Sequence, residues 1–215
     1  MCDVTDGSAF ATKGLVSRVG IRYPDMEIPR KGATFVVGES GTGKTTLLKL
    51  FNQTETQSSG SISFLGSDVA AMRATDLRRN AILCGQTVFL FDGTVRDNFT
   101  EFRRYRGLPP LCDNEIIRFL TICHGEPDLE KACRNMSGGE RARVFIAIHM
   151  SFAPTVLMLD EPTSALDRDT AAAVMRNITS HCSEKGITLI AVSHDRSIVD
   201  AFADNIIDLG GKRDG

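Results

Sequence analysis

A glycine-rich stretch that ends in lysine and threonine is the part of this sequence best suited to bind phosphate. It runs Gly38-Glu39-Ser40-Gly41-Thr42-Gly43-Lys44-Thr45. Its glycines allow the backbone to wrap around a polyphosphate with the N–H groups pointing inward. Lys44 would reach the β- and γ-phosphates of a nucleotide, and the Thr45 hydroxyl would be a ligand of Mg²⁺. The pattern therefore predicts a P-loop that binds a nucleoside triphosphate.

The segments on either side of this stretch have the composition that a P-loop requires. Residues 34–37 form an apolar run typical of a strand, and a helix is expected from Thr46 to about Asn52. The N-terminus of that helix, Thr46 included, would direct its positive end at the same anion. The alternative is an ordinary glycine-rich turn that matches the P-loop pattern by accident. The probability of such a match in a chain of this length is on the order of one per cent.

Two carboxylates, Asp160 and Glu161, directly follow the apolar run of residues 156–159. At the carboxyl end of a buried parallel strand, Asp160 would lie in the ligand crevice and hold Mg²⁺ through its water shell. Glu161 would point the other way and could polarise a water molecule that attacks the γ-phosphate. A solvated acidic turn after a core strand is the alternative interpretation.

A second candidate anion site is the sequence Ser137-Gly138-Gly139-Glu140, which opens an expected helix running to Met150. A serine cap and two glycines expose N–H groups at the positive end of a helix. A capping box between the serine and the glutamate would explain the same residues without a ligand. Paired glycines are poor helix formers, however, so helix stability alone does not account for them.

Composition excludes several classes of protein. A chain of 215 residues can form one large domain, and 42% hydrophobic with 24% charged residues is typical of a soluble globular protein. A net charge of −2 gives no electrostatic argument for a nucleic-acid partner or an anionic membrane. No apolar run approaches the roughly 20 residues that cross a bilayer. Residues 1–6 lack the basic start and apolar core of a signal peptide.

The cysteines indicate a reducing compartment. They show no Cys-x-x-Cys pair and no zinc-like spacing, and they are Cys2, Cys84, Cys112, Cys123, Cys133 and Cys182. In a chain of this size, such scattered cysteines are most simply small apolar residues. The expectation is a cytosolic protein without a disulfide framework.

Strands and helices are expected to alternate along the chain. The expected strands are residues 15–21, 34–37, 61–65, 81–84, 156–159, 187–192 and 205–209. Further helices are expected at residues 76–80, 95–102, 115–120, 139–150, 168–181 and 197–202. Such alternation predicts an α/β fold with a mainly parallel sheet flanked by helices. We expect a single domain over residues 1–215, with a core of residues 1–86 and 136–215 and an inserted helical subdomain at about 87–135.

The order of the motifs resembles that of ABC-type ATPases, a family of P-loop NTPases. Met136 and the four residues after it look like the family's signature sequence. Gln86 resembles the Q-loop, Asp167 in residues 164–167 ends a stretch similar to the D-loop, and His194 resembles the switch histidine. The resemblance extends over residues 32–210, most of the chain.

This resemblance implies a composite ATP site. Two copies would bind head to tail, and Ser137, Gly138 and Gly139 of one copy would contact the γ-phosphate of the ATP held by the other. Gln86 would sense Mg²⁺ and the attacking water, while His194 would hold the γ-phosphate. Asp167 would link the two sites. The implied cofactors are ATP and Mg²⁺.

The sequence departs from the family pattern at three places. Met136 and Glu140 replace the commoner leucine and glutamine of the signature. Ile148 stands where an arginine is usual, so a contact of that arginine would be lost. Tyr23 resembles the aromatic residue that stacks on adenine, but only 14 residues separate it from Gly38, which indicates a shortened β lobe. Stacking and an ordinary turn tyrosine both stay open.

The resemblance also implies a separate membrane permease. Residues 88–98, with Phe89, Leu90 and Phe91, would form the groove for a cytoplasmic helix of that permease together with the helical lobe. The alternative is that these aromatic residues pack inside the helical lobe. The chain would then sit at the cytoplasmic face of the membrane. The pattern of residues 89–94 is similar to exporter-type cassettes, and the compact single-cassette length resembles the ATPase subunits of small bacterial exporters, including iron exporters. The sequence is silent on the transported substrate, because specificity in the family lies in the permease.

Two other functions compete with transport. ABC ATPases that act on DNA carry a coiled coil or zinc module between Q-loop and signature, whereas 50 residues without heptads separate Gln86 from Ser137 here. Those that act on ribosomes carry two cassettes. A simple P-loop kinase would use Lys44 and Asp160 but leave the signature, Gln86 and His194 unexplained. Transport with no nucleic-acid partner is therefore the favoured expectation.

Overall fold

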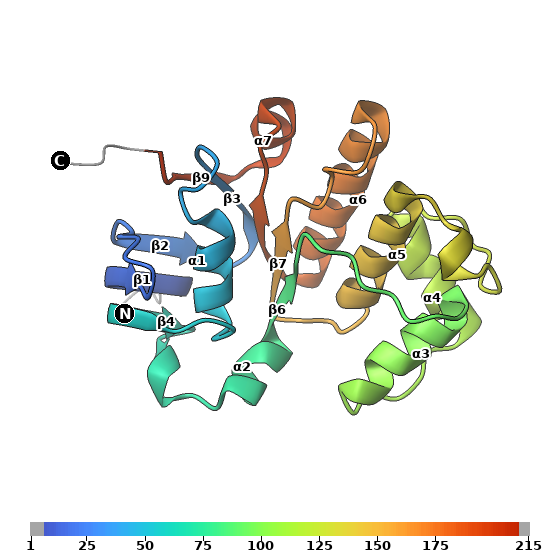
Figure 1. Cartoon of the computed structure of the whole chain (residues 1–215), viewed down its shortest axis with the longest axis horizontal. Coiled ribbons are helices and arrows are strands. Elements are labelled where there is room, and N and C mark those ends of the chain that lie inside the picture. The colour runs from blue at the N-terminus through green and yellow to red at the C-terminus, as the bar shows by residue number, and fades with distance from the viewer. Residues whose placement is uncertain (1–6, 211–215) are drawn as a thin grey trace, which may run out of the picture.

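The computed structural model describes residues 7–210, and in that range the strands form two sheets (Figure 1). The larger sheet has the order β6-β7-β8-β3-β9, and every neighbouring pair in it is parallel. The smaller sheet has the order β2-β1-β4-β5 and is antiparallel. The predicted fold class, a parallel sheet flanked by helices with a small β lobe, is confirmed.

The strands of the larger sheet are β3 (Gly32–Val37), β6 (Ala81–Cys84), β7 (Val156–Asp160), β8 (Thr188–Val192) and β9 (Asn205–Asp208). Those of the smaller sheet are β1 (Ser8–Ser17), β2 (Met26–Pro29), β4 (Gln57–Phe64) and β5 (Ser67–Asp68). The α-helices are α1 (Lys44–Phe51), α2 (Ala74–Asn80), α3 (Val95–Tyr105), α4 (Asp113–Ile122), α5 (Gly138–Met150), α6 (Arg168–Lys185) and α7 (Arg196–Phe202). Short 3₁₀ turns are η1 (Val69–Ala71) and η2 (Cys133–Asn135). None of the helices within residues 7–210 has the length and apolarity needed to cross a membrane.

Alternation along the buried strands produces a core on each face of the parallel sheet. Leu157 and Leu159 of β7 pack with residues of α5 and α6, whereas Val156 and Met158 pack with residues of α1. Figure 1 shows α1 on one side of the sheet and α5 with α6 on the other. Each such side chain contributes about 1.5–3 kcal/mol on burial. The two cores therefore fix α1 and α5 against the strands whose ends carry the predicted site.

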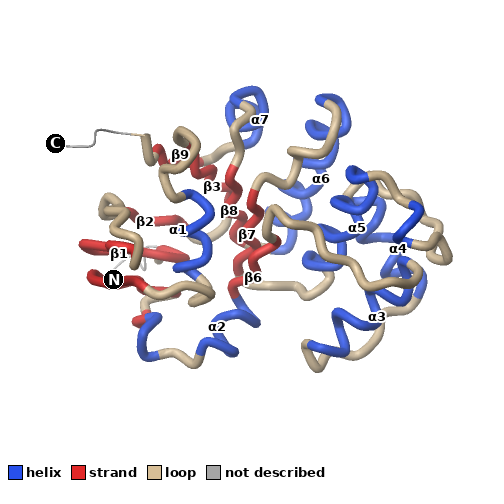
Figure 2. The backbone as a smooth tube through the Cα atoms, in the orientation of Figure 1, coloured by secondary structure: helices blue, strands red, loops and turns tan. Residues whose placement is uncertain are grey.

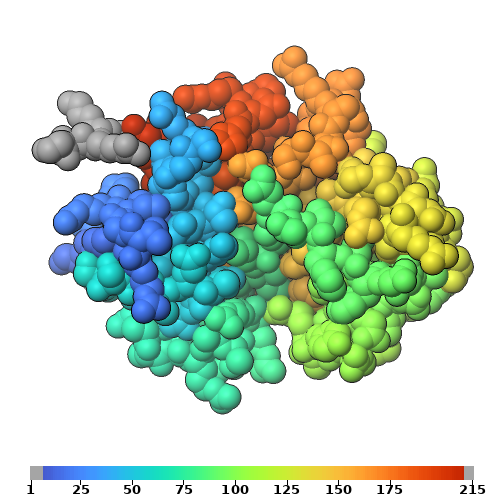
Figure 3. All heavy atoms as spheres, viewed as in Figure 1, coloured from blue at the N-terminus to red at the C-terminus, as the bar shows by residue number. Residues whose placement is uncertain are grey.

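The segment between β6 and α5 folds into helices and loops without strands (Figure 2). In the space-filling view its residues gather on the side of the molecule away from the N-terminal strands (Figure 3). The buried Asn98 fixes the start of this segment, because its amide bonds with the N–H and C=O of Phe91 at 2.8 and 3.1 Å. Helices α3 and α4 lie within residues 87–135, where the helical subdomain was expected. That these residues form a separate subdomain stays a prediction.

The first strand was predicted at the wrong place. Instead of residues 15–21, β1 covers Ser8–Ser17, and the chain then turns at Gly20, which has a φ of 86°. The turn closes with a hydrogen bond from the N–H of Ser17 to the C=O of Ile21 (2.9 Å). β2 and β5 were not predicted, because strands of four and two residues carry too little alternation to be recognised.

β4 begins at Gln57, before the alternating apolar residues from which its start at residue 61 was predicted. A close approach between the backbones of β4 and β1 explains this earlier start. A Cβ at Gly60 would lie 2.3 Å from the carbonyl oxygen of Gly14 on β1. A side chain cannot be placed there, so glycine lets the polar first half of β4 pair with β1.

Four of the described cysteines are core residues. Cys84, Cys123, Cys133 and Cys182 are buried, whereas Cys112, just before α4, is exposed. Burial raises the pKa of the Cys182 thiol to about 12. These cysteines thus serve as small apolar side chains, as predicted. Cys2 and the segment tested for a signal peptide lie outside the described residues.

Candidate functional site

The P-loop joins β3 to α1, and Lys44 is bonded to its backbone. The ammonium group donates to the carbonyls of Gly38 at 2.9 Å and Glu39 at 2.8 Å. Gly38, Gly41 and Gly43 have positive φ angles of 143°, 84° and 92°. Such angles are costly for residues with a Cβ, so the glycines are required by the shape of the loop. Strand β3, the loop of residues 38–43 and helix α1 therefore form the strand–loop–helix unit that the sequence predicts.

Tyr23 is buried beside the P-loop. Its ring is only 6% exposed and packs in the core that contains α1. Its hydroxyl donates to the carbonyl of Gly43 at 3.0 Å. A Cβ at Gly43 would lie 2.6 Å from this hydroxyl. Of the two interpretations of Tyr23, the structure supports the structural one, with the tyrosine holding the P-loop rather than presenting a face to a base.

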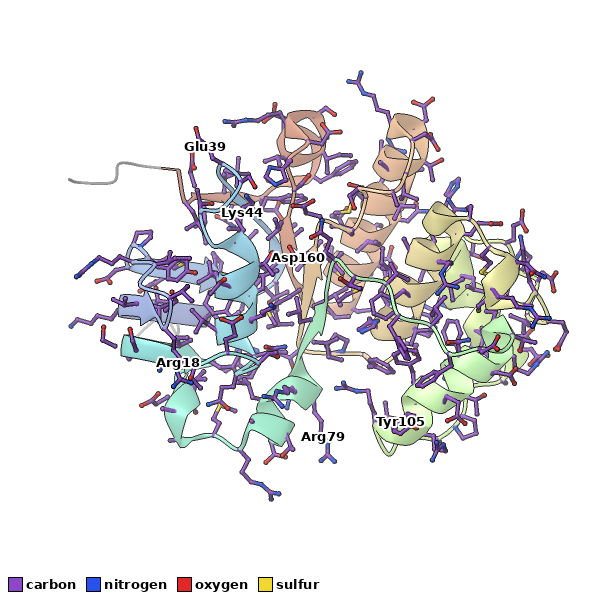
Figure 4. The ribbon with its side chains drawn as sticks, viewed as in Figure 1. Arg18, Glu39, Lys44, Arg79, Tyr105 and Asp160 are labelled. Atoms are coloured by element: carbon purple, nitrogen blue, oxygen red, sulfur yellow. The ribbon has the colours of Figure 1, made fainter. Side chains whose placement is uncertain are left out.

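Asp160 is a buried carboxylate at the end of β7, near the start of α1 (Figure 4). It is 2% exposed, and its Oδ1 has no hydrogen-bond partner among the described residues. Burial raises the pKa of Asp160, and a hydrogen bond from Thr45 acts in the opposite direction. A buried carboxylate oxygen without a partner, next to the P-loop threonine, fits a site for a hard cation such as Mg²⁺.

The carboxylate of Glu161 contacts two more of the predicted site residues, Gln86 and His194. Nε2 of Gln86 donates to Oε2 of Glu161 at 3.3 Å, and Nε2 of His194 lies 3.0 Å from Oε1. Glu161 has a φ of 52°, unusual for a residue other than glycine, and its N–H bonds to the carbonyl of Val192 at 3.1 Å. Strain of this kind is held in place by surrounding structure and is frequent at functional sites. The three residues thus form one cluster beside Asp160.

The predicted second anion site is a capped helix start. Oγ of Ser137 accepts from the N–H of Glu140 at 3.2 Å, and Oε2 of Glu140 accepts from the N–H of Ser137 at 2.7 Å. The capping box is therefore real, and it leaves the backbone N–H groups of Gly138 and Gly139 without helical partners. Within residues 7–210 no hydrogen bond joins this loop to the P-loop of the same chain.

The signature loop instead contacts the D-loop of its own chain. A Cβ at Gly139 would lie 3.0 Å from the carbonyl oxygen of Ala165 and 3.1 Å from Cδ2 of Leu166. The next acidic residue, Asp167, caps α6 by accepting from the N–H of Thr170 at 3.0 Å, and this hydrogen bond lowers the pKa of Asp167. Asp167 is therefore fixed at the end of the D-loop, and its contact with nucleotide stays a prediction.

Two other residues near the signature motif are Ile148, which the sequence analysis identified, and Lys131, which it did not. Ile148 is fully buried in the core on the α5 side, so an apolar contact stands where the resemblance would place an arginine. Lys131 was not recognised at all, yet its ammonium lies 2.6 Å from Oε1 of Glu140 in the signature. No spacing rule links the two, because Lys131 comes from an irregular loop.

Comparison with known protein families and curated proteins gives a consistent result. The family described as ABC transporter matches residues 22–164. The chain is 34% identical to the probable iron export ATP-binding protein FetA of Escherichia coli, over 81% of this chain and 77% of that protein. It is 33% identical to the protein named "Putative ABC transporter ATP-binding protein YjkB" of Bacillus subtilis, over 84% of this chain and 71% of that protein. It is also 33% identical to protein STAR1 of Oryza sativa, of which it spans 53%.

Solved structures with this fold include transporter cassettes. CbiO1 of Clostridium perfringens, described as part of an ABC transporter complex, is similar with a TM-score of 0.82 and 28% identity, over 94% of this chain and 84% of that chain. A dimeric ABC transporter cassette, MJ0796, is similar with a TM-score of 0.83 and 21% identity, over 94% of each chain. At that identity the second likeness supports the fold alone.

Tyr23→Phe tests the role of the tyrosine hydroxyl. This change keeps the ring but removes the hydrogen bond to Gly43, so ATP affinity is expected to fall about fivefold, which corresponds to one hydrogen bond of ~1 kcal/mol. Titration with a fluorescent ATP analogue measures the change. Tyr105→Phe, at the exposed tyrosine, is the control and should leave affinity unchanged. Normal affinity of Tyr23→Phe, with a loss only in Tyr23→Leu, would instead support a stacked ring.

Gly138 and Gly139 provide a matched pair for the signature–D-loop contact. Gly139→Ala pushes a methyl group against the Ala165 carbonyl, whereas a Cβ at Gly138 meets nothing within 4 Å. Gly138→Ala should be neutral or slightly stabilising, because alanine favours helix. Gly139→Ala should be less stable than Gly138→Ala by about 1–2 kcal/mol, from overpacking. Equal midpoints for the two variants in urea denaturation would exclude a tight contact.

Proposed function

We propose that this chain, which belongs to the ABC transporter family, is an ATPase that closes head to tail on a second copy and drives a separate permease. The single observation that carries the proposal is the cluster around Glu161. Gln86 and His194 follow the ends of strands β6 and β8, which lie on either side of β7, and both contact this carboxylate next to the P-loop. A simple phosphate-binding protein has no need for this arrangement.

The roles of the site residues follow from their chemistry. Phosphoryl transfer depends on positioning and charge stabilisation, so the Lys44 ammonium and the P-loop N–H groups would stabilise the γ-phosphate as its charge redistributes. The Glu161 carboxylate would orient the attacking water and accept its proton. His194 and Gln86 would keep the Glu161 carboxylate correctly positioned relative to the γ-phosphate. Thr45 and Asp160 would hold Mg²⁺, which would supply positive charge to stabilise the phosphate.

Dimerisation is proposed because the signature loop is separated from the P-loop of its own chain. α1 and α5 lie on opposite faces of the central sheet (Figure 1). The free N–H groups of Gly138 and Gly139 can therefore reach a γ-phosphate only when a second copy presents its P-loop. ATP would favour the closed pair because it contacts both copies only in that state. Hydrolysis would remove those contacts and open the pair.

An exposed group of aromatic residues is the proposed docking surface for the permease. Phe89 is 55% exposed and Tyr105 is 68% exposed. Phe91 lies between them, with ring centroids 5.0 Å from Phe89 and 5.7 Å from Tyr105. Leu90 is buried and anchors the loop. Exposed aromatic area of this kind is typical of interfaces. Phe89 and Phe91 lie on the segment that directly follows Gln86, and Tyr105 is the last residue of α3.

The proposal assigns the chain to the cytoplasmic face of a membrane through that permease. Export, the direction favoured by the pattern of residues 89–94, stays a prediction, because relatives named for iron export and for methionine import match at 34% and 32% identity. No substrate follows from the cassette.

Glu161→Gln tests the hydrolytic role. The amide cannot accept the proton of the attacking water, so ATP turnover should fall on the order of 10²-fold or more. ATP binding should persist, and the protein should accumulate as a dimer in ATP. Phosphate release and size-exclusion chromatography measure the two effects. Glu184→Gln, on the exposed end of α6, is the matched control. Near-normal turnover in Glu161→Gln would exclude Glu161 as the base.

Co-purification tests the transport role. The chain isolated from native membranes under mild detergent is expected to carry one integral membrane protein, identified by mass spectrometry. Replacing Phe89 and Tyr105 by serine should release that protein while ATP binding is retained, because the exposed aromatic surface is lost. Recovery of ribosomal proteins or DNA in place of a membrane protein would contradict the proposal.

A further inference from the structure

Lys131, in the loop between α4 and η2, contacts two carboxylates. Its ammonium lies 2.6 Å from Oε1 of Glu140 and 3.2 Å from Oε2 of Glu126. The two partners differ in environment, because the side chain of Glu126 is 68% exposed and that of Glu140 is 24% exposed. Water screens the charge of Glu126. Glu140 has less solvent around it and depends more on Lys131.

The Glu140 carboxylate is held against the loop that would receive a γ-phosphate. Its Oε2 accepts from the N–H of Ser137 at 2.7 Å, at the positive end of α5. Lys131 and this backbone hydrogen bond lower the pKa of Glu140 to about 2, so the side chain is ionised at neutral pH. The signature of this chain therefore carries a full negative charge next to two glycine N–H groups.

A negative charge at this position opposes the proposed function unless it is neutralised. The triphosphate of ATP is itself strongly negative, and closing a dimer removes water that would otherwise screen the two charges. The positive end of α5 offsets only part of a unit charge. An ammonium group in direct contact with the carboxylate supplies the rest.

The backbone around Lys131 is fixed, so its side chain has a defined position. The carbonyl of Lys131 accepts from the N–H of Val95 at 3.1 Å, and Ala132 forms a bridge with Thr94. On the following turn, the N–H of Cys133 donates to the carbonyl of Gly93 at 2.9 Å. The loop is thus paired with the start of α3. The lysine is therefore held in place before any partner binds.

We infer that Lys131 is a positioning residue of the signature motif, which holds and neutralises Glu140 so that residues 137–139 can accept the γ-phosphate of ATP bound to a second copy of this chain. This role rests on the proposed function, because it acts only in the closed dimer. It predicts that Lys131 matters when Glu140 is charged and becomes dispensable when Glu140 is neutral.

A thermodynamic cycle tests this dependence. The parent is the full chain with Glu161→Gln, which prevents turnover, and sedimentation velocity measures dimer formation against ATP concentration. Lys131→Gln should raise the ATP concentration for half-maximal dimerisation about tenfold, the scale of one charge–charge interaction at a partly exposed site. Glu140→Gln alone should dimerise at the same or a lower ATP concentration than the parent. Adding Lys131→Gln to Glu140→Gln should have no further effect.

Three control variants separate charge from structure. Lys131→Arg keeps the charge and should dimerise as the parent does, which shows that the position tolerates substitution. Lys185→Gln removes the same charge from the exposed end of α6 and should have no effect. Glu126→Gln removes only the exposed partner of Lys131 and should also have no effect. In dilute protein, where the chain is monomeric, Lys131→Gln should bind ATP with the affinity of the parent.

Several outcomes would overturn the inference. A Lys131→Gln variant that dimerises like the parent excludes the role, and so does a loss of the same size in the Glu140→Gln background, which would indicate a structural effect. A loss of ATP affinity in the monomer would indicate instead that Lys131 is needed for the folding of the region around the P-loop. If the parent itself fails to dimerise in ATP, the proposed function is wrong and this inference falls with it.

Discussion

The parallel arrangement of the central strands is the constraint on which the rest of the molecule depends. In a parallel sheet the carboxyl ends of all strands lie at one edge. β3 ends at Val37, directly before the P-loop, and the neighbouring strands β8 and β7 end side by side, with Asp160 paired to Val192. Gln86 and His194 each follow the end of a strand by two residues. The register of hydrogen bonds alone thus brings distant parts of the sequence to one site.

Much of this site could be predicted because its residues follow recognisable strands. Continuous apolar runs identify β3, β6, β7 and β8, and the polar residues directly after them are then placed by the sheet. The P-loop and the Asp160–Glu161 pair were identified in this way. Gln86 and His194 needed the resemblance to a family as well, since a single glutamine or histidine after a strand has no pattern of its own. The structure then showed that both contact Glu161.

Contacts made by irregular segments could not be predicted. Tyr23 was identified as an aromatic residue near the nucleotide, but its burial depends on how the small antiparallel sheet packs on α1. Lys131 meets Glu140 because the loop before η2 pairs with the start of α3, and neither segment has a period from which register could be deduced. β1 was misplaced for a related reason, since its polar residues and the turn at Gly20 hide the alternation. In each case the position of the residue or strand depends on tertiary packing, which the local sequence pattern does not determine.

The distribution of cysteines described above makes the chain well suited to chemical labelling. Thiolates, not thiols, react with alkylating reagents, and burial in the core keeps the thiols of Cys84, Cys123 and Cys182 protonated and out of reach. Among the described cysteines, Cys112 alone is exposed, and it lies between α3 and α4. A fluorophore attached there, with Cys2 replaced by serine, would report the distance between these helices and a probe on the nucleotide. The apolar core thus leaves a single exposed thiol among the described cysteines as a spectroscopic label on the helical segment.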